Sequence, residues 1–498
     1  MGDQGGSFSA VDTPHGLAKR RMVKHYCAAL FGRQLEFAKY QKSRSREYSV
    51  AYIDAFCWRG EYGGPATRSQ EGEEEEEVQE GDIARMGSPI IALDRALDRC
   101  KIMLDKGVRF GEPFLAVHFV FNDINQENIE NLKRLVQNWF LDYDWVIELD
   151  EGYDDYENLN HNSKSFLWRH EAEHGAPWLI RTTFVVGKFE KLQIPPADKT
   201  FSLIDPCGIK QIPYEAVKRF LGPKKEVFIN LMVWTIRRSS ANPRHAGLIQ
   251  KLFGTPEADS VISSYEKCPD CDTVGRCCKR EAYRGYVEEY VKAIQREFGH
   301  TSEAVSFLFS KGKTDKEVGD QFYMVYLSCD MDLDMVKKMK DAMVPNTQKP
   351  DGELRHTDYY SFKGIQIPFG RKTTDEEERN AIYEHFRGET ASLLDVKCWI
   401  LLKSPFAFHS HPLGQLENQQ LLTVSMVEKR NLGNFKASDF HRRPSGGNSW
   451  QLTFHHAPTP PTCPYCGHTT KAKSAKAAKA AIKSHIKNKH AVELELGI

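Results

Sequence analysis

Between residues 16 and 345, short runs rich in β-branched and aromatic residues alternate with segments of helical periodicity. This alternation limits the fold more than any other feature, because strands separated by helices build a largely parallel sheet covered by helices. The expected strands are Val50 to Phe56, Ala116 to Asn122, Trp145 to Leu149, Phe201 to Ile204, Glu226 to Trp234, Val305 to Phe309 and Phe322 to Ser328. We therefore predict one α/β domain over residues 15–345.

The last two expected strands indicate an antiparallel end of this sheet, because they are separated only by a polar, Gly-containing loop at residues 310–320. A mixed sheet of seven strands with such an end is typical of class I methyltransferases. Periodicity alone does not separate that pattern from other doubly wound folds. The expected fold class is α/β and Rossmann-like.

Charge and hydropathy restrict where a partner can bind. Lys plus Arg (68) and Asp plus Glu (68) cancel, so an affinity for nucleic acid or for anionic lipid must be local. The longest apolar run is far shorter than the ~20 residues that span a bilayer, and the first residues lack the apolar part of a signal peptide. We expect an intracellular protein, nuclear or cytoplasmic, that is neither secreted nor embedded in a membrane.

Acidic residues follow several of the expected strands. Ligands of doubly wound sheets bind outside the carboxyl ends of the strands, so these residues are the candidates for chemistry. Asp54 is followed by a loop that could bring backbone N–H groups toward a carboxylate or phosphate, and Asp123 could accept hydrogen bonds from both hydroxyls of a ribose. Asp205 would face the group to be modified. The predicted cofactor-binding residues are Asp54, Phe56, Gly60 and Asp123, and the predicted catalytic residues are Asp205 and Pro206.

With these motifs the chain resembles the three-Cys-motif partner (TcmP-like) family, which is similar to S-adenosylmethionine-dependent methyltransferases and carries a C-terminal winged helix. The resemblance covers residues 15–440 and rests on Lys19 with His25-Tyr26, on Tyr52 to Phe56 with Gly60, on Gly87 to Leu93, on Asp205 to Gly208 and on Tyr323 to Tyr326. It implies S-adenosyl-L-methionine as the cofactor and methyl transfer as the reaction. The family's three-Cys motif belongs to a partner protein and is not assigned to cysteines here.

Two departures from the family pattern open an alternative. Trp58 stands where the loop after the first strand has a glycine, and a Trp adopts positive φ only at a cost. Cys207 and Gly208 replace the Pro and aromatic residue that adenine N6-methyltransferases use, so Tyr214 or Trp234 would have to provide the stacking face. The rival hypothesis is a non-catalytic nucleic-acid-binding or adaptor protein that retains the fold. A third hypothesis is a Mg²⁺-dependent nuclease that uses the acidic cluster of Asp150, Glu151, Asp154 and Asp155.

The C-terminal region carries the most specific motif of the chain, a C-x₂-C-x₁₈-H-x₄-H pattern. Its ligands are Cys463, Cys466, His485 and His490, with His468 as a competing ligand. Two Cys on a turn and two His on one helical face can hold a structural Zn²⁺, although the spacer exceeds the 12 residues usual in C₂H₂ fingers. A weaker candidate metal site consists of Cys268, Cys271, Cys277 and Cys278; its alternative is a reduced Cys-rich loop.

Lysines alternate with alanines inside the predicted finger, and no acidic residue lies between its first and last ligand. Steps of three and four place most of them on one helical face, where they would neutralise phosphates; the alternative is a solvated helix. The lysines predicted to contact nucleic acid are Lys471, Lys473, Lys476, Lys479, Lys483 and Lys487. Lys without Arg, Asn or Gln at base-reading positions favours contact with the nucleic-acid backbone over the reading of bases.

Composition shifts divide the chain into further segments. An acidic run makes residues 63–82 a predicted disordered surface insertion. The remaining predictions are a connecting segment at 346–385, a winged helix at 386–455, a Pro-rich linker at 456–462 and the zinc finger at 463–490. The winged helix would contact either nucleic acid through its wing or a protein partner. The leading hypothesis is a methyltransferase-like protein delivered to DNA or RNA by these C-terminal parts.

Overall fold

The computed structural model describes most of the chain. The described residues are 14–42, 48–61, 86–148 without 109 and 111, 163–255 without 172–175 and 241, 276–298, 303–310, 321–328, 333–343, 359–362, 365–368, 375–426 without 405 and 407–409, and 450–455. The chain divides into two compact units, Met1–Lys372 and Thr373–Ile498.

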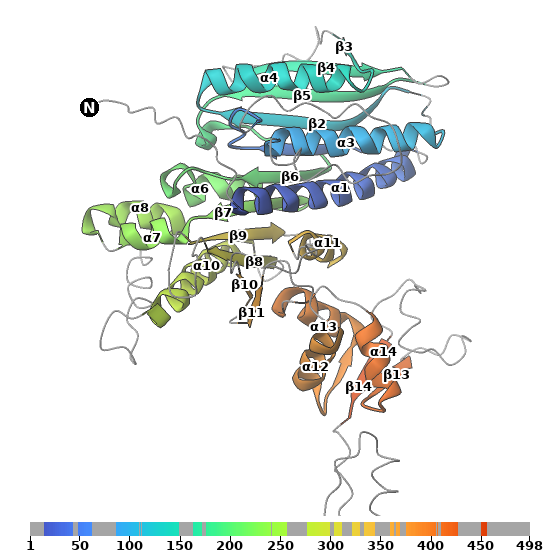
Figure 1. The fold of residues 1–498 in the computed structure, drawn as a ribbon, viewed down its shortest axis with the longest axis vertical. Helices are drawn as coiled ribbons and strands as arrows, with labels where there is room; N and C mark the ends of the chain where they lie inside the picture. Colours follow the sequence, from blue (N-terminus) through green and yellow to red (C-terminus); the bar gives the residue numbers. More distant parts are fainter. Residues whose placement is uncertain are drawn as a thin grey trace, which may run out of the picture. The chain divides into compact units, whose positions relative to one another are not determined.

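The first unit is a mixed α/β domain built on a nine-stranded sheet with the order β3-β4-β5-β2-β1-β6-β7-β9-β8 (Figure 1). The strands are β1 (Val50–Asp54), β2 (Phe114–Asp123), β3 (Val146–Glu148), β4 (Ser163–His170), β5 (Trp178–Val186), β6 (Lys199–Ile204), β7 (Lys225–Leu231), β8 (Glu303–Ser310) and β9 (Gln321–Ser328). The five strands from β5 to β7 are parallel. Strand β9 is antiparallel to both β7 and β8, and β3 and β4 form an antiparallel extension at the other edge.

Helices cover both faces of the sheet. They are α1 (Pro14–Lys42), α3 (Ser88–Asp105), α4 (Gln126–Leu141), α6 (Tyr214–Val217), α7 (Val233–Ser240), α8 (Ala246–Phe253), α10 (Arg276–Phe298) and α11 (Leu333–Met343). Short 3₁₀ turns are η1 (Phe189–Lys191), η2 (Ile209–Gln211), η3 (Lys218–Phe220) and η4 (Pro243–His245), and β10 (Tyr359–Phe362) pairs with β11 (Ile365–Pro368). Successive side chains of a strand point to opposite faces. Ile53 accordingly joins the core under α6, α8 and α10, whereas the Tyr52 ring lies 6.4 Å from that of Phe31 in α1.

A buried ion pair lies at the amino ends of β6 and β7. The Lys199 ammonium is 2.7 Å from the Glu226 carboxylate, and the Tyr26 hydroxyl of α1 donates to the same carboxylate. All three side chains are buried. Because paired charges compensate each other's desolvation, we assign this cluster to fixing α1 on the sheet, at the edge opposite the carboxyl ends.

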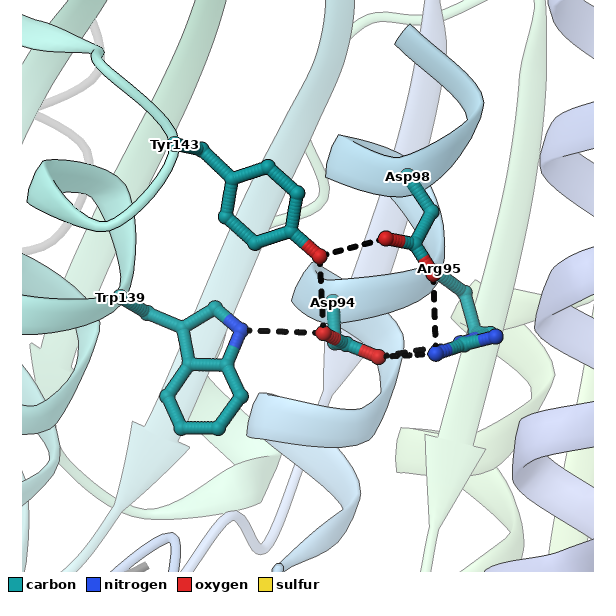
Figure 2. A network of polar contacts seen from close by, with 5 residues as sticks. All are labelled: Asp94, Arg95, Asp98, Trp139 and Tyr143. Atoms are coloured by element: carbon teal, nitrogen blue, oxygen red, sulfur yellow. Dashed lines mark hydrogen bonds and ion pairs between the residues drawn. The ribbon is translucent and has the colours of Figure 1, made fainter. Parts of the chain in front are cut away.

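A second polar network fixes α3 against α4. Asp94, a buried residue of α3, accepts hydrogen bonds from the Trp139 indole at 3.2 Å and from the Tyr143 hydroxyl at 3.1 Å. Arg95 pairs with Asp94 and, at 2.9 Å, with Asp98, which also accepts from Tyr143. Figure 2 shows Trp139 and Tyr143 pointing from the α4 side toward this helix. Because α3 begins beside the end of β1, the network also holds the start of α3 in place.

The second unit is a small α/β unit with three helices and a three-stranded antiparallel sheet of order β12-β14-β13 among its described residues. Its elements are α12 (Asp375–Phe386), β12 (Thr390–Ser392), α13 (Leu393–Cys398), the π-helical turn η5 (Trp399–Lys403), α14 (Ser410–Asn418), β13 (Leu422–Met426) and β14 (Trp450–Phe454). Ser392 and Asp395 cap α13 reciprocally. Ile382 and Phe386 of α12 lie in the core of this unit, although the sequence placed most of α12 in a connecting segment.

The structure corrects the expected strands at two points. The segment Trp145 to Leu149 was predicted as the third parallel strand, but β3 is a short antiparallel edge strand, and the third parallel strand is β5. The expected strand Glu226 to Trp234 ends at Leu231, because the chain leaves the sheet there and Val233 begins α7. Among the helices that the structure describes, none is long and apolar enough to cross a membrane.

Candidate functional site at the carboxyl ends of the strands

Three of the predicted acids meet at the carboxyl edge of the sheet. Asp54 is the last residue of β1 and pairs in register with Phe121 of β2 and Leu203 of β6. Asp123 and Asp205 each lie two residues beyond those partners, so the three carboxylates end adjacent parallel strands. Both neighbours contribute electrostatically to raising the pKa of Asp54. The structure therefore brings together three carboxylates that are distant in sequence, at the edge of the sheet where ligands of doubly wound sheets bind.

Asp54 is buried and acts on the protein itself. Its carboxylate accepts a hydrogen bond from the Ser88 hydroxyl at 2.6 Å and from the Phe56 N–H at 3.4 Å. Burial raises its pKa to about 7, with the Ser88 hydrogen bond opposing that shift and Asp205 adding to it. Through these two hydrogen bonds the buried side chain links the start of α3 to the loop after β1.

The loop after β1 is closed by its own backbone hydrogen bonds. The N–H groups of Ala55, Cys57 and Trp58 donate to the Leu203 carbonyl (2.9 Å), the Asn122 carbonyl (3.0 Å) and the Asp123 carboxylate (3.2 Å). The sequence suggested that these amides would point at a ligand, but here they bond within the protein. Trp58 has φ 48, so it adopts the left-handed conformation that a glycine would take more easily.

Gly60 and Gly87 fix the end of this loop by close backbone contact. The Gly87 N–H donates to the Gly60 carbonyl at 2.8 Å. Gly60 has φ 79, and a Cβ there would lie 2.4 Å from Leu132 Cδ1 in α4. A Cβ at Gly87 would lie 2.8 Å from the Gly60 carbonyl carbon. Both positions therefore require glycine, which gives Gly60 a structural role beside the cofactor-binding role predicted for it.

Asp123 is partly exposed and retains acceptor capacity. It accepts from the Asn125 N–H at 2.7 Å, from the Asn128 amide at 3.3 Å and from the Trp58 N–H. A carboxylate offers about four acceptor sites, so one stays available without any rearrangement. Directly beside it, the Ile124 side chain is 64% exposed. Sequence reasoning missed Ile124, although an apolar residue immediately after a strand-end acid was a usable signal.

Asp205 is held from two sides at the end of β6. The Lys19 ammonium of α1 lies 2.6 Å from one carboxylate oxygen, and the Asn230 amide of β7 donates to the other at 2.7 Å. Lys19 is one of the residues that carry the family resemblance, whereas the sequence did not predict a role for Asn230. Pro206 is buried and Cys207 is exposed. Burial, followed by the neighbouring Asp205, raises the pKa of the Cys207 thiol.

The two proposed stacking residues have different environments. Tyr214 is buried, donates from its hydroxyl to the Ala293 carbonyl at 3.0 Å and packs under Gly254, so it does not offer a free ring face. Trp234 is half-buried on α7, and the Arg238 guanidinium lies 5.7 Å from its ring centroid. Of the two, only Trp234 remains a candidate.

Several predicted residues fall outside the part of the chain that the structure describes. These are the zinc ligands Cys463, Cys466, His485 and His490, the lysines between them, the acids Asp150, Glu151, Asp154 and Asp155, and the cysteines Cys268 and Cys271. Cys277 and Cys278 lie in the first turn of α10. Within the described residues, no group of three or more His, Cys, Asp or Glu side chains is arranged to hold a metal ion.

Comparison with known proteins gives a distant structural similarity and no match in sequence. The sequence matches no protein-family model and no curated protein. Among solved structures, the chain has similarity to the protein LPL1258 from Legionella pneumophila, described as a DUF519 protein, at 9% identity and a TM-score of 0.27. The match covers 66% of this chain and 94% of that one.

Proposed function

We propose that the protein is an S-adenosyl-L-methionine-dependent methyltransferase that acts on nucleic acid. The observation that carries this proposal is the strand order β5-β2-β1-β6-β7-β9-β8, with β9 reversed, combined with acids at the ends of β1, β2 and β6. Class I methyltransferases share that order of seven strands. On this reading β3 and β4 extend the sheet beyond its seven-stranded part.

The residues around Asp123 fit a nucleoside. The remaining acceptor site of Asp123 suits a ribose hydroxyl, and the exposed Ile124 beside it suits the face of a purine ring. Phe56 and Gly60 belong to the adjoining loop, where the methionine end of the cofactor would lie. Asp54 holds that loop in place by accepting hydrogen bonds from the Phe56 N–H and the Ser88 hydroxyl. When bound, S-adenosylmethionine supplies an electrophilic methyl group.

Asp205 and Pro206 suit an amine on the target. The Asp205 carboxylate and the Pro206 carbonyl accept hydrogen bonds from the amine, which orients its lone pair toward the methyl carbon. Lys19 and Asn230 hold the carboxylate in one orientation. Because orientation and exclusion of water provide most of the acceleration in such a displacement, this chain needs no further acid or base.

The C-terminal parts would deliver the enzyme to its substrate. The order α12-β12-α13-α14-β13-β14, with an antiparallel sheet, supports the proposed winged helix. The predicted zinc finger with its Lys-rich helix would bind phosphates of DNA or RNA, with Zn²⁺ in a structural role. A protein partner of the winged helix is the alternative for that unit.

A second candidate function is a non-catalytic nucleic-acid-binding or adaptor protein with the same fold. The observation that favours it is Trp58, whose N–H already donates to Asp123 and whose side chain replaces a glycine. A loop closed in this way would keep the protein's architecture without admitting a cofactor.

Calorimetric titration with S-adenosylmethionine separates the two candidates. The enzyme proposal expects micromolar binding that Asp123→Ala abolishes. Asp105→Ala is the matched control, because Asp105 is an exposed acid at the opposite end of α3 and should bind like the wild type. Absence of binding to the wild-type protein would refute the enzyme and leave the adaptor.

A further inference from the structure

Helix α7 and the turn after it form a locally basic surface in a chain without net charge. Between Glu226 and Glu257 the sequence contains no acidic residue, yet it contains Arg237, Arg238, Arg244 and Lys251. Arg238 and Arg244 are exposed and Arg237 is half-buried. None of these three arginines forms an ion pair with a residue that the structure describes. Their charges are therefore available to a partner.

The face of α7 that carries these groups is set by its packing. Val233, Ile236 and Ser239 are buried against the first unit, which leaves the positions between them on the outer side. Trp234 and Arg238, four residues apart, lie on that side with the guanidinium 5.7 Å from the indole centroid. An Arg stacked beside a half-exposed Trp is a surface that can bind both a phosphate and an unpaired base.

This surface lies next to Asp205. Asn230, near the end of β7, donates to the Asp205 carboxylate at 2.7 Å, and Trp234 follows four residues later. Four residues of chain span at most ~14 Å, so the indole is within about two nucleotides' reach of the site. Figure 1 shows α6, α7 and α8 at the end of the first unit where α1 begins. Lys19 belongs to this first part of α1, which starts at Pro14.

We infer that the surface formed by Trp234, Arg237, Arg238 and Arg244 binds an unpaired stretch of nucleic acid and guides it to Asp205. The inference rests on the proposed function, because it assigns the substrate-binding surface of that same site. An amine on a base is out of reach within a duplex, so the segment that enters must be unpaired. Trp234 stacks on one of its bases and the arginines contact its phosphates.

Binding of a fluorescent 20-nucleotide single strand, measured by anisotropy in the full chain from 50 to 300 mM salt, tests the inference. Because salt dependence reports released counterions, Arg237→Gln with Arg238→Gln should lower the slope of log affinity against log salt by about 0.7 for each lost phosphate contact. Trp234→Leu should weaken binding about fivefold to a hundredfold, and Trp234→Tyr should restore most of it. The control, Lys101→Gln with Lys106→Gln, changes two exposed lysines at the opposite edge of the sheet and should bind like the wild type.

A photocrosslink locates the contact independently of the C-terminal lysines. A strand that carries 5-iodouracil should crosslink to the peptide with Trp234 in the wild type and not in Trp234→Leu. Crosslinks confined to residues 463–490, unchanged salt slopes in the arginine variant, or equal affinity for a fully paired duplex would each overturn the inference. Titration of the same variants with S-adenosylmethionine keeps the two proposals apart. If the wild-type protein does not bind S-adenosylmethionine, the proposed enzyme is refuted, whereas the measured contact between nucleic acid and this surface is unaffected.

Discussion

The buried carboxyl group at the end of β1 should make the stability of the protein depend on pH. Asp54 has no exposed surface, and burial raises its pKa from 3.8 to about 7. Replacement by Asn keeps an oxygen that can accept from the Ser88 hydroxyl while it removes the titrating proton. The substituted protein therefore resembles the protonated wild type at every pH.

The sign and size follow from proton linkage. An acid with a raised pKa in the folded state binds more protons when folded, so stability is highest at low pH and falls as pH rises through the folded pKa. For a pKa of about 7 in the folded state against 3.8 in the unfolded state, linkage removes roughly 2 to 3 kcal/mol between pH 5 and pH 8. Asp54→Asn has no titrating group at this position and does not show that loss. The free energy of unfolding of the variant, relative to that of the wild type, should therefore rise by this amount between pH 5 and pH 8.

Urea unfolding of both proteins at pH 5, 6, 7 and 8, followed by tryptophan fluorescence, measures the difference. The control is Asp105→Asn, which makes the same substitution at an exposed acid at the end of α3. If the difference between Asp54→Asn and the wild type is the same at pH 5 and pH 8, Asp54 is ionised throughout. The argument from burial would then be refuted.

Four further outcomes are expected. Tyr143→Phe removes a donor shared by two carboxylates of α3 and should lower the free energy of unfolding by about 2 kcal/mol in urea titrations. Gly60→Ala meets both a positive φ and a 2.4 Å contact, and it should destabilise the protein by roughly 1 to 3 kcal/mol. If the proposed enzyme is correct, Lys19→Met should reduce kcat for methyl transfer at least tenfold while calorimetry shows unchanged cofactor binding. Elemental analysis should find bound zinc that Cys463→Ser lowers by one ion per chain, and zinc-free wild-type protein would contradict the finger.

The parallel centre of the sheet was predictable, whereas its polar edge was not. Strands β1 and β2, and the segment Phe201 to Ile204 of β6, are largely apolar runs between turn signals, which suffices for a buried parallel strand. In β5, Arg181, Thr182 and Thr183 interrupt the apolar pattern, although all three are buried. Thr182 accepts from the Trp168 indole of β4 at 2.9 Å. Thr183 likewise bonds to His118 of β2 and Ser165 of β4, both at 2.9 Å. Such cross-strand partners make the burial of the two threonines tolerable, and pairing is not visible in one sequence.

The acids of the candidate site were predictable from their position after strands, but their partners were not. Ser88, Asn230 and Ile124 reach the site from α3, β7 and the turn after β2, and their roles depend on how these elements pack. For Trp58 the sequence predicted strain at positive φ, and the structure has it at φ 48. Its backbone N–H bonds to Asp123, which offsets part of that strain.

The hydrogen bonds of Asp123 distinguish the two candidate functions. Each of the three acids is held by donors of the protein itself, Asp54 by Ser88, Asp205 by Lys19 and Asn230, and Asp123 by Trp58, Asn125 and Asn128. A ribose hydroxyl can bond to Oδ2 of Asp123 beside the Trp58 N–H, but Oδ1 already accepts from the Asn125 N–H and the Asn128 amide. A ribose that uses both oxygens must therefore replace one of the two donors on Oδ1, whereas the Trp58 hydrogen bond can stay. In an adaptor nothing competes for Asp123, so all three hydrogen bonds would persist as part of the fold.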